Sequence, residues 1–69
     1  MATTQTFATV DERDIIVSLT TCETDEQAQE WYRTSARGGR LVVLDLGAAE
    51  RPEVGNAVDV SVDGVATLI

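Results

Sequence analysis

The segment DIIVSLTTCETDEQAQEWYRTSARGGRLVVLDL, residues 14–46, predicts a strand, a helix and a second strand in succession. Side chains alternate along a strand, so its first part, residues 14–21, should present one face to a core and the other mostly to solvent. The predicted core face consists of Ile15, Val17 and Leu19, and the predicted outer face of Ile16, Ser18 and Thr20.

The middle of this segment predicts a single helix over residues 25–37. Thr24 is a suitable N-cap, and Gln27 stands three residues later, as a capping box requires. Gly38 and Gly39 supply a left-handed stop after the helix. The side chains that recur at helical spacing form one stripe, Ala28, Trp31, Tyr32, Ser35 and Ala36. We expect one aromatic residue to anchor the core and the other to reach its rim, and the alternative, packing of both in the core, is the commoner outcome for such a pair.

The helix begins acidic and ends basic. Asp25 and Glu26 lie near the positive end of the helix dipole, and Arg33 and Arg37 lie near the negative end. Glu30 stands three residues before Arg33, which allows an ion pair on one face. This charge gradient stabilises a surface helix without any ligand.

Four further strands are expected around the first strand and the helix. Residues 4–10 should pair with residues 14–21 as an antiparallel hairpin across the charged turn DERD, residues 11–14. Residues 40–46, RLVVLDL, form the most apolar strand and should lie centrally. Residues 57–62 and 65–69 should form a hairpin with Asp63 and Gly64 as a two-residue turn. This register places Val62 opposite Val65, Val60 opposite Thr67 and Val58 opposite Ile69.

The pattern predicts one α+β domain over residues 1–69. A small, mainly antiparallel sheet of four to five strands would carry one α-helix on one face, in the order β-β-α-β-β-β. One helix cannot cover five strands. Either the sheet curls strongly around the helix or a second molecule covers the remainder, and we expect a homo-oligomer.

Composition excludes several classes of function. The 69 residues include twelve acids, five arginines, no lysine and no histidine, so the net charge is −7. Phosphate groups repel such a chain, which makes direct nucleic-acid binding unfavourable. The longest apolar run, LVVL, is too short to span a membrane. The start MATTQTFATV lacks the features of a signal peptide, and the single cysteine is typical of a cytoplasmic protein.

The sequence contains few groups that could catalyse a reaction. Cys22 has no histidine to act as its base and no second cysteine to form a disulfide or a zinc site. Carboxylates act as general acids or bases only when one is desolvated in a cleft, and these acids stand in turns and caps. The segment DVSVDG, residues 59–64, resembles the opening of a calcium-binding loop, but its closing acid would fall beyond Ile69. We therefore expect no enzyme, no cofactor and no metal.

Two sets of charged residues are candidate contact sites. The first set is predicted to bind a basic protein partner and consists of Asp11, Glu12, Asp14, Glu23, Asp25 and Glu26. Its two halves could stand at opposite ends of the sheet and would then form no single patch. The second set is a possible anion or interface contact and consists of Arg33, Arg37, Arg40 and Tyr32.

The leading functional hypothesis is a small acidic interaction module without catalysis. Small acidic inhibitors, adaptors and nucleic-acid mimics of bacteriophages and their hosts offer an analogy in size and charge. The alternative is a structural subunit that assembles with its own copies through an open strand edge.

Overall fold

The computed structural model describes residues 4–35 and 39–69. Within them the chain forms β1 (Gln5–Val10), β2 (Ile16–Cys22), α1 (Asp25–Thr34), β3 (Arg40–Leu44), β4 (Val58–Val60) and β5 (Val65–Leu68). All five strands belong to one sheet, in the order β2-β1-β3-β5-β4. The predicted α+β class and element order are confirmed. The sheet is mixed, because β3 and β5 run parallel whereas the other neighbours are antiparallel.

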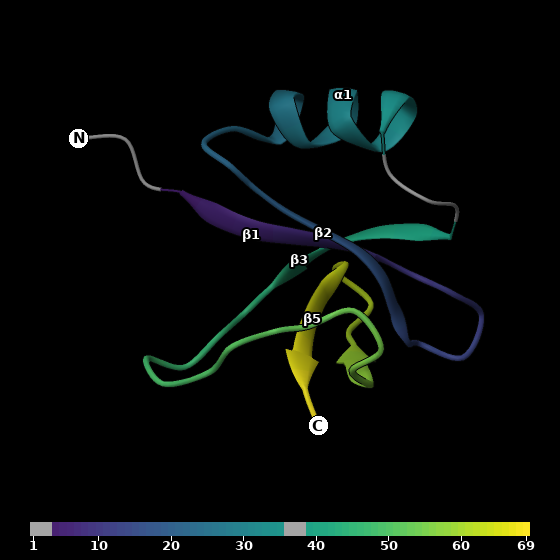
Figure 1. Cartoon of the computed structure of the whole chain (residues 1–69), viewed down its shortest axis with the longest axis vertical. Helices are drawn as coiled ribbons and strands as arrows, with labels where there is room; N and C mark the ends of the chain where they lie inside the picture. Colours follow the sequence, from purple (N-terminus) through teal and green to yellow (C-terminus); the bar gives the residue numbers. More distant parts are fainter. Residues whose placement is uncertain (1–3, 36–38) are drawn as a thin grey trace.

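The strands β1, β2 and β3 separate two layers (Figure 1). Helix α1 lies on one side of them, and β4, β5 and the loop 45–57 lie on the other. The larger apolar cluster is on the side away from the helix and comprises Ala8, Val10, Ile16, Val42, Leu44, Val58 and Ala66. The smaller cluster lies under the helix and comprises Phe7, Cys22 and Ala28, with Trp31, Leu41 and Val43 packed against it.

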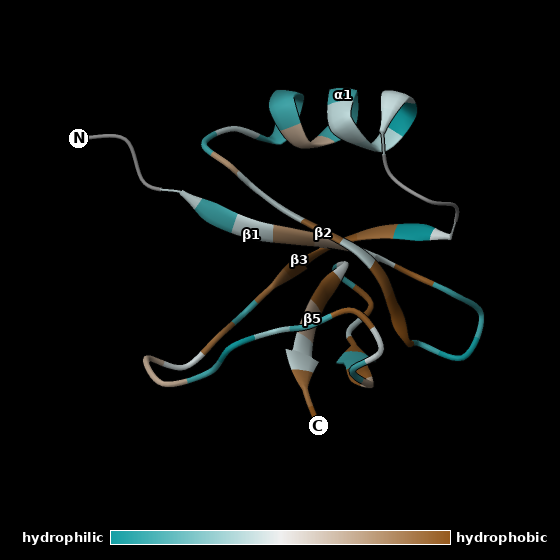
Figure 2. Cartoon of the chain, in the orientation of Figure 1, coloured by the Kyte–Doolittle hydropathy of each residue, from teal (hydrophilic) through white to brown (hydrophobic). Residues whose placement is uncertain are grey.

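The sheet curls away from the helix and nearly closes on itself. Ile15 forms a β-bridge with Ala57, so the start of β2 meets the start of β4. The Ile16 N–H donates to the Asn56 carbonyl at 3.0 Å, and the Gly55 N–H donates to the Ile16 carbonyl at 2.8 Å. Of the two alternatives that the sequence left open, a sheet curled around the helix is therefore not the arrangement found. Figure 2 shows brown, hydrophobic segments in β2, β3 and β5, whereas α1 is mostly teal and white.

Helix α1 begins where the capping pattern predicts. The Thr24 hydroxyl oxygen accepts the Gln27 N–H at 3.1 Å, and the Gln27 side-chain oxygen accepts the Glu23 N–H at 2.8 Å. The helix ends at Thr34 with Ser35 as C-cap, three residues before the predicted end. The Thr34 hydroxyl donates to the Glu30 carbonyl at 2.8 Å, a bond that competes with regular helix hydrogen bonding. The rest of the predicted helix, Ala36 and Arg37, and the predicted stop residue Gly38 lie outside the described residues.

A bulge in β2 reverses part of the predicted strand pattern. Thr9 pairs with Ser18, but Val10 pairs with Ile16, so Val17 is an extra residue that faces no partner on β1. An extra residue shifts the alternation by one position. Ile16, predicted to face solvent, is consequently 0% exposed and packs with Val10, whereas Ile15 is only half-buried.

The β4–β5 hairpin also differs from its predicted register. The Ser61 N–H donates to the Val65 carbonyl at 2.8 Å, so the loop has three residues, Val62, Asp63 and Gly64. Such loops place a left-handed residue last, and Gly64 has φ +83°. Val58 therefore pairs with Leu68 and Val60 with Ala66. The predicted opposition of Val62 to Val65, Val60 to Thr67 and Val58 to Ile69 is wrong, and Val62 is fully exposed.

Strand β3 lies in the middle of the sheet, and its two faces are those that the sequence predicts. Val42 and Leu44 join the larger cluster, and Leu41 and Val43 contact the smaller one. Gly39, predicted as a helix stop, instead stands directly before β3 with φ +108°. A Cβ at Gly39 would lie 1.9 Å from the Val10 carbonyl oxygen. Glycine therefore lets β3 enter the sheet close against β1.

Candidate functional site

The acids of the β1–β2 turn largely hold that turn together. The Asp11 carboxylate accepts the Arg13 N–H at 2.8 Å and the Ile15 N–H at 3.0 Å. The Ile15 hydrogen bond, then that of Arg13, holds the pKa of Asp11 below its ordinary value. Asp14 has φ +61° and forms an ion pair with Arg40 at 2.6 Å. Glu12 is exposed, and the described residues offer it no ion-pair partner.

The acids at the start of α1 are free by comparison. Glu23, Asp25 and Glu26 are exposed, and none of them forms an ion pair within residues 4–35 and 39–69. Asp25 and Glu26 occupy the first helical turn, where the helix dipole favours negative charge. The capping bonds of Thr24 and Gln27 fix the backbone under these carboxylates.

The two acidic groups lie at opposite ends of the β1–β2 hairpin. The register pairs Gln5 with Cys22 at the end that leads to α1, and Val10 with Ile16 at the turn. Five to six residues of strand, roughly 17–20 Å, therefore separate the two groups. They do not form one patch. In the part of the chain that the structure describes, all three carboxylates at the helix start lack an ion-pair partner, whereas in the turn only Glu12 lacks one.

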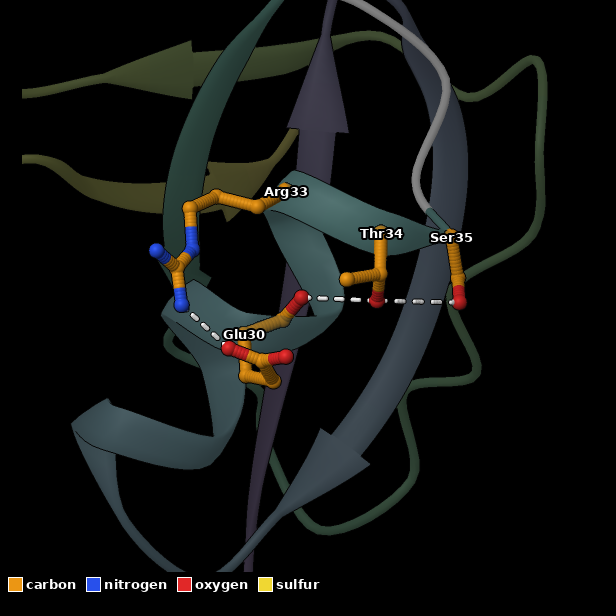
Figure 3. Close-up of polar contacts among 4 residues, drawn as sticks. All are labelled: Glu30, Arg33, Thr34 and Ser35. Atoms are coloured by element: carbon orange, nitrogen blue, oxygen red, sulfur yellow. Dashed lines mark hydrogen bonds and ion pairs between the residues drawn. The ribbon is translucent and has the colours of Figure 1, made fainter.

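The described residues of the arginine set already have partners in the chain. Arg33 pairs with Glu30 on the helix surface, and the Thr34 hydroxyl lies between the Glu30 carbonyl and the Ser35 hydroxyl (Figure 3). Arg40 pairs with Asp14, and the Tyr32 hydroxyl donates to the Gly39 carbonyl at 2.5 Å. Arg37 lies outside the described residues.

A groove of about 460 Å³ lies beside α1, over the part of the sheet that the helix leaves uncovered. Phe7, Leu41 and Val43 supply its apolar lining, and they belong to the smaller cluster. Asp25 and Gln29 border it from the helix, Gln5 from β1 and Asp63 from the β4–β5 loop. The remaining lining residues are Ala28, Val42 and Gly64.

The charge that lines the groove is negative. Its charged lining residues, within the part of the chain that the structure describes, are the two carboxylates of Asp25 and Asp63. They stand far apart in the sequence and line the same groove because β5 lies beside β3. The sequence identified Asp25 as a candidate and Asp63 only as a turn residue. No local pattern links these two positions.

A second hollow of about 440 Å³ lies at the free edge of β2. Its lining residues are Thr6, Leu19, Thr20, Thr21 and Pro52. Strand β2 is the last in the sheet order, and its outer side is bonded at Ile16 to Gly55 and Asn56. The edge beyond this bridge borders the hollow.

In residues 4–35 and 39–69, the remaining candidate groups for metal binding or catalysis form no site. No group of three or more His, Cys, Asp or Glu side chains could hold a metal ion there. Residues 59–64 resemble a calcium-binding loop in sequence, but in the structure they form the end of β4 and a hairpin turn. Cys22 is buried beside Phe7 and Ala28. In the same described ranges, no helix combines the length and hydrophobicity that a membrane crossing requires.

Comparison of the chain with protein-family models, with curated proteins and with solved structures finds no match.

Proposed function

We propose that the protein is a cytoplasmic, non-catalytic interaction module that binds a basic protein partner through the carboxylates at the start of α1. The observation that carries this proposal is the groove beside α1, whose charged lining residues among those described are Asp25 and Asp63. An apolar floor with an anionic rim complements a basic side chain, which has an apolar stem and a charged head. The lone buried cysteine suits a reducing compartment.

The distribution of charge supports the same partner. Arg13, Arg33 and Arg40 each lie within ion-pair distance of an acid of their own chain. The excess negative charge of −7 is therefore carried by other acids, among them Glu23, Asp25 and Glu26. Such a field attracts a basic partner and raises its rate of association, especially at low ionic strength.

Removal of charge at the helix start should reduce capture of the partner by about tenfold. Three exposed ion pairs at about 0.2–1 kcal/mol each correspond to roughly 3- to 150-fold in affinity. The test immobilises the protein, captures partners from its native host and compares it with a variant that carries Glu23→Gln, Asp25→Asn and Glu26→Gln. Mass spectrometry quantifies each captured protein at two salt concentrations, because salt screens exposed ion pairs.

The matched control removes the same number of charges elsewhere. Asp45, Glu53 and Asp59 are exposed and do not line the groove. A variant with Asp45→Asn, Glu53→Gln and Asp59→Asn should capture the partner nearly as well as the unaltered protein. Equal loss in both variants would show that only net charge matters, and undiminished capture by the helix-start variant would refute the proposal.

The outer edge of β2 beyond its bonds to Gly55 and Asn56 favours a second candidate function, which is self-assembly. Residues Ile16–Cys22 contain no charge and no proline, the usual features that protect an edge strand from pairing with another chain. Thr21 is exposed on this edge strand. If copies pair through β2, sedimentation should show dimers at high protein concentration, and Thr21→Lys should shift the population toward monomers.

The control for this experiment is Thr67→Lys. Thr67 is also an exposed threonine on a strand, but β5 is paired on both sides, with β3 and β4. The control should leave the dimer population unchanged. A monomer that persists at every concentration would remove self-assembly as a function.

A further inference from the structure

We propose that the groove beside α1 binds an extended peptide segment through one arginine side chain and through the backbone of β3. This inference rests on the proposed function and deepens it, because it names the occupant of the groove. Three observations carry it: an incompletely paired stretch of β3, an apolar floor and a rim of hydrogen-bond acceptors.

The first observation is the short pairing between β3 and β5. Strand β3 pairs with β1 over five residues, from Arg40 to Leu44, but with β5 only at Val43 and Leu44. The Val43 N–H donates to the Gly64 carbonyl at 3.1 Å, and the Asp45 N–H donates to the Ala66 carbonyl at 2.8 Å. Backbone groups of every second residue point to the same neighbour, so Leu41 directs its N–H and carbonyl to this side as well.

The backbone of Leu41 has an open side because the chain turns away from β3. The Gly64 N–H, which would continue the ladder, donates to the Ser61 carbonyl at 3.1 Å. Among residues 4–35 and 39–69, no backbone group pairs with Leu41 on the β5 side. Leu41 and Gly64 both line the groove. An extended segment placed there would continue the line of β5 and satisfy these groups, as in other cases of strand addition.

The second observation is the floor. Leu41 and Val43 are half-buried and expose part of their side chains, and Phe7 lies beneath them in the smaller cluster. The three methylene groups of an arginine can cover such a surface while the guanidinium remains at the rim. An acidic or purely polar side chain would leave this surface without an apolar partner.

The third observation is the rim, which presents acceptors from several directions. Asp25 and Asp63 offer carboxylates, and Gln5 and Gln29 offer amide oxygens. A guanidinium has five N–H donors in one plane and is less strongly hydrated than an ammonium group. Arginine can therefore bond to several of these acceptors at once, whereas lysine acts as a compact charge. We infer a preference for arginine over lysine.

The experiment titrates the 15N-labelled protein with the peptide acetyl-Ala-Val-Arg-Val-Ala-amide at low salt and follows each amide by NMR. We expect shifts concentrated at Gln29, Leu41 and Gly64. The same peptide with lysine should bind about two- to fivefold more weakly. Citrulline, which keeps the shape of arginine without its charge, should weaken binding further, and N-methylation of the two valines should remove the backbone bonds and weaken binding as well.

Variants of the protein test the rim. Asp25→Asn and Asp63→Asn should each weaken binding by about two- to fivefold, the range expected for one exposed ion pair. Asp59→Asn is the matched control, because Asp59 is an exposed acid that does not line the groove. Its affinity should equal that of the unaltered protein. The spectrum of each free variant shows whether it is folded.

Three results would overturn the inference and separate it from the proposed function. Shifts centred on the β1–β2 turn, or equal weakening by Asp59→Asn, would show that a basic peptide binds outside the groove. The groove would then not be the binding site, but the proposal of a basic partner would remain. Absence of binding also overturns the groove assignment, and capture from the host then decides the proposed function independently.

Discussion

Gly39→Ala is expected to unfold the protein, or to remove most of its stability. Gly39 has φ +108°, and a Cβ there would lie 1.9 Å from the Val10 carbonyl oxygen and 2.8 Å from its carbon. Val10 is fully buried and pairs with Arg40, so its backbone cannot retreat without breaking the β1–β3 ladder. A chain of 69 residues has about 3–10 kcal/mol of stability, and strain plus a backbone clash is expected to consume at least 3 kcal/mol. Urea denaturation followed by circular dichroism measures the loss.

The control for this prediction is Gly55→Ala. Gly55 has φ +100°, close to that of Gly39, but a Cβ there would meet nothing within 4 Å. The control therefore tests the left-handed backbone alone, which costs about 1–2 kcal/mol for alanine. The difference between the two variants isolates the contact with Val10. If both variants lose the same stability, β3 does not approach β1 as closely as described.

Ile16→Ala should cost about 2–5 kcal/mol, the range for truncation of a fully buried aliphatic side chain. Ile16 is 0% exposed and among the largest fully buried side chains. It joins β2 to the larger cluster at the point where β2 and β4 meet. The hydrogen bonds at this point are made by backbone atoms, so truncation leaves them available and tests packing. Thermal and urea unfolding of the purified variant measure the effect.

Ile15→Ala provides the matched comparison, because the residue type is the same and the position is adjacent. Ile15 is half-buried, so its truncation should cost about 1 kcal/mol. Simple alternation along residues 14–21 predicts the reverse order, with Ile15 in the core and Ile16 outside. A larger loss for Ile15→Ala than for Ile16→Ala would therefore contradict the bulge at Val17.

Sequence patterns over a few residues correctly predicted the features that depend on interactions between residues close along the chain. Thr24 and Gln27 start the helix because their side chains bond to backbone groups within a few residues. The alternation of Val42 and Leu44 with Leu41 and Val43 predicted both faces of β3 because each face is buried against one layer. The acids Glu23, Asp25 and Glu26 were identified from their place near the helix start, although only the structure separates them from Asp11 and Asp14.

Features that depend on contacts between distant segments were missed. The bulge at Val17 depends on the pairing of β2 with β1 and on the bridge that joins the start of β2 to the start of β4. The apolar residues around Val17 are compatible with either register, so the local sequence does not predict the bulge. The Asp63–Gly64 pair suggested a two-residue turn, but Ser61 closes a three-residue loop by accepting the Asp63 and Val65 N–H groups on its hydroxyl. The burial of Thr9 is a further such feature, because no local pattern marks this residue for the core. Thr9 is 0% exposed, and its hydroxyl has no hydrogen-bond partner among the described residues.

The sequence by itself determined the succession of strands and helix along the chain, the cap of α1, the acidic net charge and the absence of histidine and of a second cysteine. These properties follow from composition and from interactions between residues close along the chain. Tertiary structure alone decided that the sheet curls away from the helix, that Ile16 rather than Ile15 is buried, and that Asp25 and Asp63 line the same groove. The reason is that a helix with a single fully buried residue, Ala28, cannot cover the sheet. The strands must cover their own apolar side, and this closure brings distant residues together.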